Sequence, residues 1–158
     1  MFFGVSTLQT FHVLISFAAI GAGLWVLFGM FASRRMNNAT FVFLATTLVT
    51  TVTGFLLPLK GFTPAVGTGI VSLLVMAVAF WARYGAGMQG RWRGAYVVSA
   101  VISLYLNVFV LVAQLFLKVP ALKALAPNGS EPPFLIAQGL TLALFVWAGA
   151  AALKRFRP

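Results

Sequence analysis

Five long apolar stretches, separated by short clusters of basic residues, constrain this chain more than any other feature. A helix needs roughly 20 apolar residues to cross about 30 Å of hydrocarbon. Hydrophobic residues make up 61% of the 158 positions and charged residues only 8%, whereas a soluble domain is about one quarter charged. The pattern predicts an all-α polytopic integral membrane protein, a single domain over residues 1–158. Five transmembrane helices are expected at about 5–31, 40–57, 64–82, 94–117 and 133–153.

Prolines and basic residues mark the expected ends of these helices. Pro58 ends the second span, because proline lacks the N–H that a helix interior needs. Thr63 and Pro64 form the cap and first turn with which the third span is expected to open. Arg83 is expected to close that span in a loop. The segment that begins at Lys118 carries leucines and lysines at helical spacing and would form a short amphipathic helix in the membrane interface.

The basic residues are divided unequally between the two sides that five alternating spans create. Eight of the eleven would lie on one side and three on the other. The larger group consists of Arg34, Arg35, Arg83, Arg91, Arg93, Lys154, Arg155 and Arg157, and the smaller of Lys60, Lys118 and Lys123. Because cytoplasmic loops carry the excess of Lys and Arg, we expect the N-terminus outside and the C-terminus in the cytoplasm. A four-span topology, with the second or third stretch as a re-entrant hairpin, fits the charges as well.

The net charge of +10 does not indicate a nucleic-acid partner here, since the charges lie in short clusters between apolar runs. The strings TVTGFLLP and YLNVFVLVAQLF resemble segments of small bacterial inner-membrane proteins. We therefore expect the bacterial inner (plasma) membrane as the location. The expected partners are the lipid bilayer and either further copies of the chain or the other subunits of a larger membrane complex.

Polar side chains within the spans are the best guide to function, because burying them in hydrocarbon is costly unless they find partners. With the predicted orientation, several spans bring polar groups to the outer half or the middle of the bilayer. The candidates for one ligand-binding site are His12, Thr50, Thr53, Asn107, Gln114 and Gln138. Gln114 is expected to be the closest neighbour of His12. The alternative is that the threonines bond to carbonyls of their own helix and the amides join neighbouring helices.

Small residues also share a face with His12 on the first span, at Ala19 and Gly23. Such faces allow two helix backbones to approach closely. We expect the first span to pack tightly against a neighbour there.

The chain offers little acid–base chemistry, since it has one acidic residue, Glu131, one histidine and no cysteine. Catalysis by paired carboxylates, a Ser-His-Asp triad and a zinc site are therefore excluded. We expect a small non-enzymatic membrane protein, an oligomeric or accessory subunit, whose polar outer-half pocket binds a small molecule or lipid. The alternative is a haem-binding electron carrier, or a proton or small-solute transporter, that uses His12. Haem b would then be held by His12 with Met76, or by His12 of two copies.

Overall fold

The computed structural model describes residues 7–56, 64–128 and 131–157, and its regular elements are all helical. Five of the helices are long and apolar enough to cross a membrane, which confirms the predicted all-α class. The elements are α1 (Thr7–Phe31), α2 (Asn37–Leu56), α3 (Pro64–Phe80), the π-helical turn η1 (Trp81–Gly85), α4 (Arg91–Lys118), α5 (Pro120–Leu125) and α6 (Pro132–Arg155).

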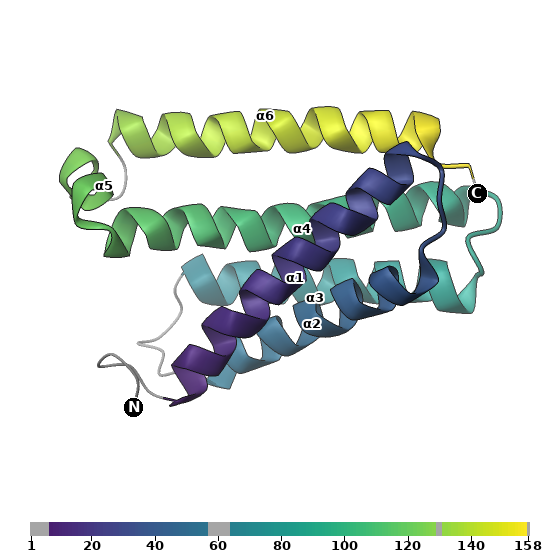
Figure 1. Ribbon diagram of the computed structural model, residues 1–158, viewed down its shortest axis with the longest axis horizontal. Helices are drawn as coiled ribbons and strands as arrows, with labels where there is room; N and C mark the ends of the chain where they lie inside the picture. The colour runs from purple at the N-terminus through teal and green to yellow at the C-terminus, as the bar shows by residue number, and fades with distance from the viewer. Residues whose placement is uncertain (1–6, 57–63, 129–130, 158) are drawn as a thin grey trace.

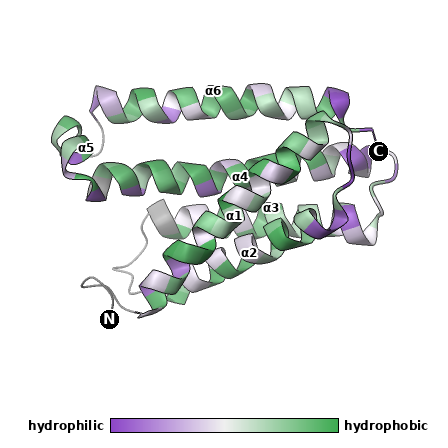
Figure 2. Ribbon diagram, in the orientation of Figure 1, coloured by the Kyte–Doolittle hydropathy of each residue, from purple (hydrophilic) through white to green (hydrophobic). Residues whose placement is uncertain are grey.

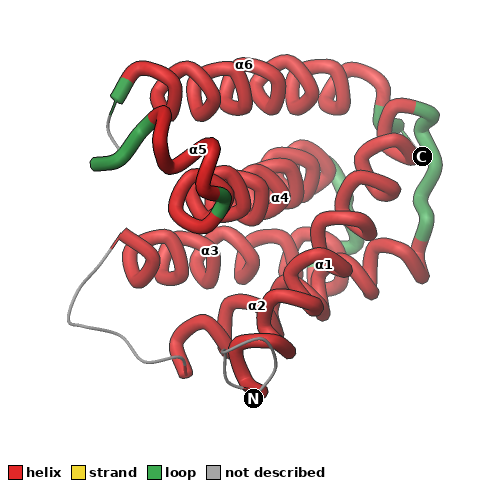
Figure 3. Tube along the Cα trace, turned by 60° about the vertical axis from the view of Figure 1, so that its left-hand side comes forward, coloured by secondary structure: helices red, strands yellow, loops and turns green. Residues whose placement is uncertain are grey.

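The helices form an elongated bundle in which α4 has a central place (Figure 1). α6 lies along one side of α4 and α3 along the other, and α2 lies beyond α3 (Figure 3). α1 crosses the bundle obliquely, so that its last turn approaches α6 while its first turn lies beside the end of α2 (Figure 1). At the α1–α6 contact, the ring centroids of Phe31 and Trp147 are 6.0 Å apart.

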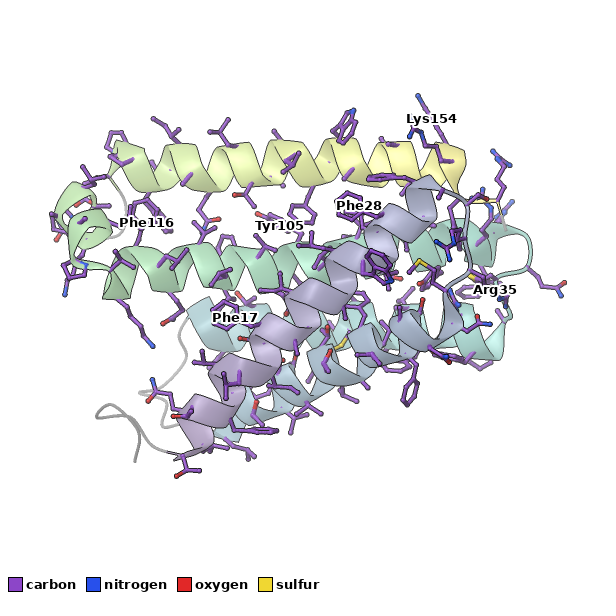
Figure 4. The ribbon with its side chains drawn as sticks, viewed as in Figure 1. Phe17, Phe28, Arg35, Tyr105, Phe116 and Lys154 are labelled. Carbon is purple, nitrogen blue, oxygen red and sulfur yellow. The ribbon has the colours of Figure 1, made fainter. Side chains whose placement is uncertain are left out.

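The two ends of the bundle differ in polarity. Hydrophilic residues gather at the end that holds the α1–α2 connection, the η1–α4 connection and the last turn of α6 (Figure 2). Arg35 and Lys154 both lie there (Figure 4). We name this the basic end, and we name the opposite end, where α5 lies, the α5 end. The first turn of α1 is near the α5 end and the last turn of α6 is at the basic end (Figure 1).

Several helix ends differ from the prediction. α4 begins at Arg91, directly after Gly90, whose positive φ of 59° suits a residue without Cβ. α6 begins at Pro132, and the Glu131 side chain accepts a hydrogen bond from the Asn128 N–H (2.9 Å) rather than capping α6. The predicted short helix after Lys118 is present as α5. Pro58 and Thr63 lie outside the described residues.

The third helix also continues past its predicted end. The Ala86 N–H donates to the Trp81 carbonyl over 2.7 Å, the i→i+5 spacing of a π turn. Arg83 therefore lies within a helical turn and not in an exposed loop, so the expectation for Arg83 is wrong. Its side chain is only 4% exposed.

The buried Arg83 guanidinium connects η1 to the start of α2. Its Nη2 donates to the Arg35 carbonyl over 2.8 Å and to Oδ1 of Asn37 over 2.7 Å. Its central carbon lies 5.0 Å from the centroid of the Tyr96 ring, a cation–π distance. The cation is thus stabilised by a carbonyl, an amide oxygen and an aromatic face, which together replace the water that burial removes.

The C-terminal residues close the basic end. Phe156 is 1% exposed, and its ring centroid lies 6.0 Å from that of Tyr96. Nη1 of Arg93 donates to the carbonyls of Leu153 (3.3 Å) and Phe156 (2.6 Å), at the end of α6 where carbonyls lack partners within the helix. The main apolar core surrounds these contacts, so this end of the bundle is closely packed.

The small face of α1 lies against α2 and α4. Ala19 and Gly23 are buried. A Cβ atom at Gly23 would lie 2.6 Å from Cδ1 of Leu104 and 2.8 Å from Cε1 of Phe43. A Cβ here would force the Leu104 and Phe43 side chains to shift, so glycine allows the helices to approach as closely as they do.

Candidate functional site

A cavity of about 600 Å³ lies among α1, α2, α3 and α4, toward the α5 end. The oblique path of α1 separates its first half from α6 (Figure 1), and residues of that half, including Phe17, line the cavity. Figure 4 shows Phe17 on the side of α1 that faces α4. Hydrophobic side chains form much of the wall. Its polar residues are Gln9, His12, Ser16, Thr50, Thr51, Thr68, Ser72, Asn107, Gln114 and Lys118.

His12 is held in position by α2. Its Nδ1 lies 2.8 Å from Oγ1 of Thr53. The Thr53 hydroxyl has a single proton, and this proton is directed at the carbonyls of Val49 (2.8 Å) and Thr50 (3.0 Å). The Thr53 oxygen therefore accepts from Nδ1–H, and we assign the lone pair of the ring to Nε2 on this basis. The result is a histidine with a defined orientation and an acceptor nitrogen at the cavity.

Three other hydroxyls of the wall also give their protons to their own helices. Thr50 donates to the Thr46 carbonyl over 2.7 Å, and Thr51 to the Thr47 carbonyl over 3.0 Å. Ser16 donates to the Val13 carbonyl over 2.6 Å. Such bonds to the preceding turn are the packing role that threonine and serine commonly take in membrane helices. They leave the oxygens of Ser16, Thr50 and Thr51 as hydrogen-bond acceptors only.

Asn107 both lines the cavity and joins two helices. Its Nδ2 donates over 3.2 Å to Oγ1 of Thr47, which is fully buried on α2. This interhelical bond is the alternative role expected for a membrane asparagine. The amide oxygen remains as an acceptor, and the second Nδ2 proton remains as a donor.

Two side chains with hydrogen-bond donors, Gln114 and Lys118, lie on the last turns of α4 at the end of the cavity that we call its mouth. Gln114 is exposed, and among the described residues its amide has no hydrogen-bond partner. Lys118 follows one turn later, in the last turn of α4. Gln114, the expected closest neighbour of His12, lines the same cavity, and the hydrogen bond of the imidazole is made to Thr53.

Gln138 lies elsewhere. Its Nε2 donates over 3.1 Å to the carbonyl of Phe109, and it does not belong to the described lining of the cavity. The reason is the position of α4, which stands between α6 and helices α2 and α3 (Figure 3), while α1 approaches α6 only with its last turn. Tyr105 and Phe116 also fill the space between α4 and α6 (Figure 4). Gln138 therefore joins α6 to α4 and does not line the cavity with His12.

Met76, the alternative haem ligand, is 1% exposed and is not among the described residues that line the cavity of His12. The structure therefore does not place the two side chains around one site. Among the described residues there is also no group of three or more His, Cys, Asp or Glu side chains suited to a metal ion.

Sequence reasoning missed six of the polar lining residues, and periodicity could have found most of them. They are Gln9, Ser16, Thr51, Thr68, Ser72 and Lys118. Gln9 and Ser16 share a helical face with His12, and Lys118 shares one with Gln114 at i, i+4. Thr68 and Ser72 are also four residues apart, on a span that carried too few polar groups to attract a site assignment.

Comparison with family models, with curated proteins and with solved structures returns no match for this chain. The chemistry of the cavity must therefore be read from its own residues. It combines an apolar wall, acceptor oxygens and an oriented imidazole with an amide and an ammonium at the mouth. This arrangement can bind and orient an amphipathic molecule.

Proposed function

We propose that this protein is a non-enzymatic integral membrane protein, an accessory or oligomeric subunit whose cavity binds a lipid or another small amphipathic molecule. The observation that carries the proposal is the cavity of about 600 Å³ lined by His12, Asn107 and Gln114. Its volume falls within the roughly 300–1,000 Å³ of small-molecule sites. A histidine fixed by a hydrogen bond to a second helix is more than packing requires.

The proposal includes a topology in which five helices cross the bilayer with the basic end in the cytoplasm. α2 and the candidate span Val66–Gly85 contain 20 residues each, a length of about 30 Å at 1.5 Å per residue. These lengths favour full crossings over a re-entrant hairpin. The cavity then lies in the outer half of the bilayer.

Reporter fusions test this topology. A reporter in the connection before Arg91 is expected to give a cytoplasmic signal, and a reporter after Asn128 an external signal. The reason is that the basic residues concentrate at the basic end, where Arg91 lies. A cytoplasmic signal from both sites would contradict five crossings.

A partner subunit or a second copy would most readily meet α6. This helix is the least buried of the five candidate spans, and its large apolar side chains Leu140, Val146 and Trp147 are each more than 60% exposed. In a membrane this face contacts lipid or a partner helix. If the protein is a subunit, as proposed, a partner helix covers this face of α6.

Haem ligation by His12 is the alternative function. The bond from Nδ1–H to Thr53 is an orientation that metal-ligating histidines commonly use. Met76 does not line the described cavity of His12, which disfavours the His12–Met76 pair. A second haem ligand would then have to come from another chain. The polar and apolar lining supports the amphipathic ligand better.

The cavity proposal can be tested by filling it. Ser16→Trp places a large side chain in the lining, whereas Leu14→Trp, on the same helix, replaces a side chain that is 64% exposed. Native mass spectrometry of protein purified from membranes should show a lipid-sized adduct on the wild type and on Leu14→Trp. Ser16→Trp should lose most of the adduct, since its indole occupies the same volume. Equal adducts on all three proteins would show that the bound molecules lie on the outer surface.

A further inference from the structure

The distribution of donors and acceptors in the cavity indicates more about its ligand than its volume does. In the part of the wall around His12, the hydroxyl protons of Ser16 and Thr50 are used on carbonyls of their own helices. The Nδ1 proton of His12 is used on Thr53. What remains on these three side chains is a set of lone pairs, on Nε2 of His12 and on the two hydroxyl oxygens.

A carbonyl, ether or ester head would meet this wall with another set of lone pairs. Oxygens that face each other without a proton between them form no hydrogen bond, and leaving polar groups unpaired after desolvation is costly. A head that carries an O–H would instead donate to Nε2. The two donors near the mouth, on Gln114 and Lys118, can then bind the acceptor oxygens of the same head.

We infer that the cavity selects amphipathic molecules whose polar head carries a hydroxyl donor, and that His12 Nε2 is the group that accepts it. The inference rests on the proposed function, because it names the ligand class of the same cavity. Phenol, quinol and alcohol heads belong to this class, and their methyl ethers do not. Thr53 is a positioning residue: it acts by holding the proton of the ring on Nδ1.

A matched pair of probes tests the selectivity. 4-Octylphenol and 4-octylanisole differ only in that the second carries a methyl group in place of the hydroxyl proton. Each probe is tritiated, and its binding to the full chain in phosphatidylcholine nanodiscs is measured, with empty nanodiscs as the blank. We expect the wild type to bind the phenol about tenfold more tightly than the anisole, the effect of losing one hydrogen bond to a buried acceptor.

Thr53→Val tests whether Thr53 acts by holding the ring proton of His12 on Nδ1, because it leaves the shape of the cavity nearly unchanged. Valine has nearly the same shape as threonine but cannot accept from Nδ1–H, so Nε2 can carry the proton instead. We expect the preference for the phenol to fall to about twofold or less while the anisole still binds. Thr53→Ser should restore the preference. Thr46→Val is the matched control, because Thr46 makes the same kind of bond to its own helix and does not line the described cavity.

The outcomes distinguish this inference from the proposed function. If the wild type binds both probes equally, the hydroxyl selectivity is refuted and the cavity remains a binding site. If Thr53→Val keeps the full preference, the positioning role of Thr53 is refuted. If neither probe binds while lipid adducts persist in mass spectrometry, the ligand class is wrong. If adducts are absent as well, the proposed function fails with it.

Discussion

Arg83→Ala is expected to lower the midpoint of thermal unfolding in detergent more than replacement of an exposed arginine at the basic end. The substitution removes the donors that bond to the Arg35 carbonyl and to Asn37, and the cation over the Tyr96 ring. It also leaves an unfilled space where a side chain only 4% exposed had been packed. Together these losses should reduce the free energy of unfolding by about 2–4 kcal/mol.

The control for this prediction is Arg91→Ala. Arg91 is exposed at the same end of the bundle, so its replacement changes the charge of the basic end, and hence the topology signal, by the same amount. Arg83→Lys should recover only part of the loss, because an ammonium cannot reproduce the planar arrangement of guanidinium donors. Equal midpoints for Arg83→Ala and Arg91→Ala would show that the buried contacts contribute nothing to stability.

Gly23→Leu is the second substitution for which we expect a large effect. Even a Cβ at this position would lie within 3 Å of Leu104 and Phe43, so a leucine must push α1 away from α2 and α4. Overpacking of this kind costs about 1–3 kcal/mol, and more where the backbone has to move. The unfolding midpoint in detergent should fall accordingly.

Gly21→Leu provides a control on the same helix. A Cβ at Gly21 would meet nothing within 4 Å, and the residue is exposed. Its substitution should leave the midpoint nearly unchanged or raise it slightly, because leucine is a better helix former than glycine. If the two leucine variants have the same unfolding midpoint, the small face of α1 does not stabilise the bundle.

The long helices were predictable because a membrane span has a strong signature in sequence. Each needs a long apolar run, and the charged residues can lie only near its ends. The contact of Gly23 was predictable for a related reason, since a small residue on a polar face rarely faces lipid. The meeting of His12, Asn107 and Gln114 at one cavity followed from depth, which the alternating direction of the spans defines.

The positions of Gln138 and Arg83 could not be predicted in the same way. The depth of a residue in the bilayer does not determine which neighbouring helix its side chain contacts. In this bundle α4 separates Gln138 from the cavity. For Arg83, a basic residue at the end of an apolar run is usually exposed or extends to the headgroups. Its burial depends on the π turn and on acceptors more than 40 positions earlier in the chain, and neither leaves a local pattern.

A density map of the wild-type protein in nanodiscs made from its native lipids would show directly whether the cavity holds a ligand bound to His12. We expect an elongated non-protein feature among α1, α2, α3 and α4. Its polar end should lie within about 3 Å of Nε2 of His12, the distance of a hydrogen bond, while Nδ1 remains bonded to Thr53. A map in which protein side chains fill this space, or in which the imidazole of His12 turns into the lipid, would contradict it.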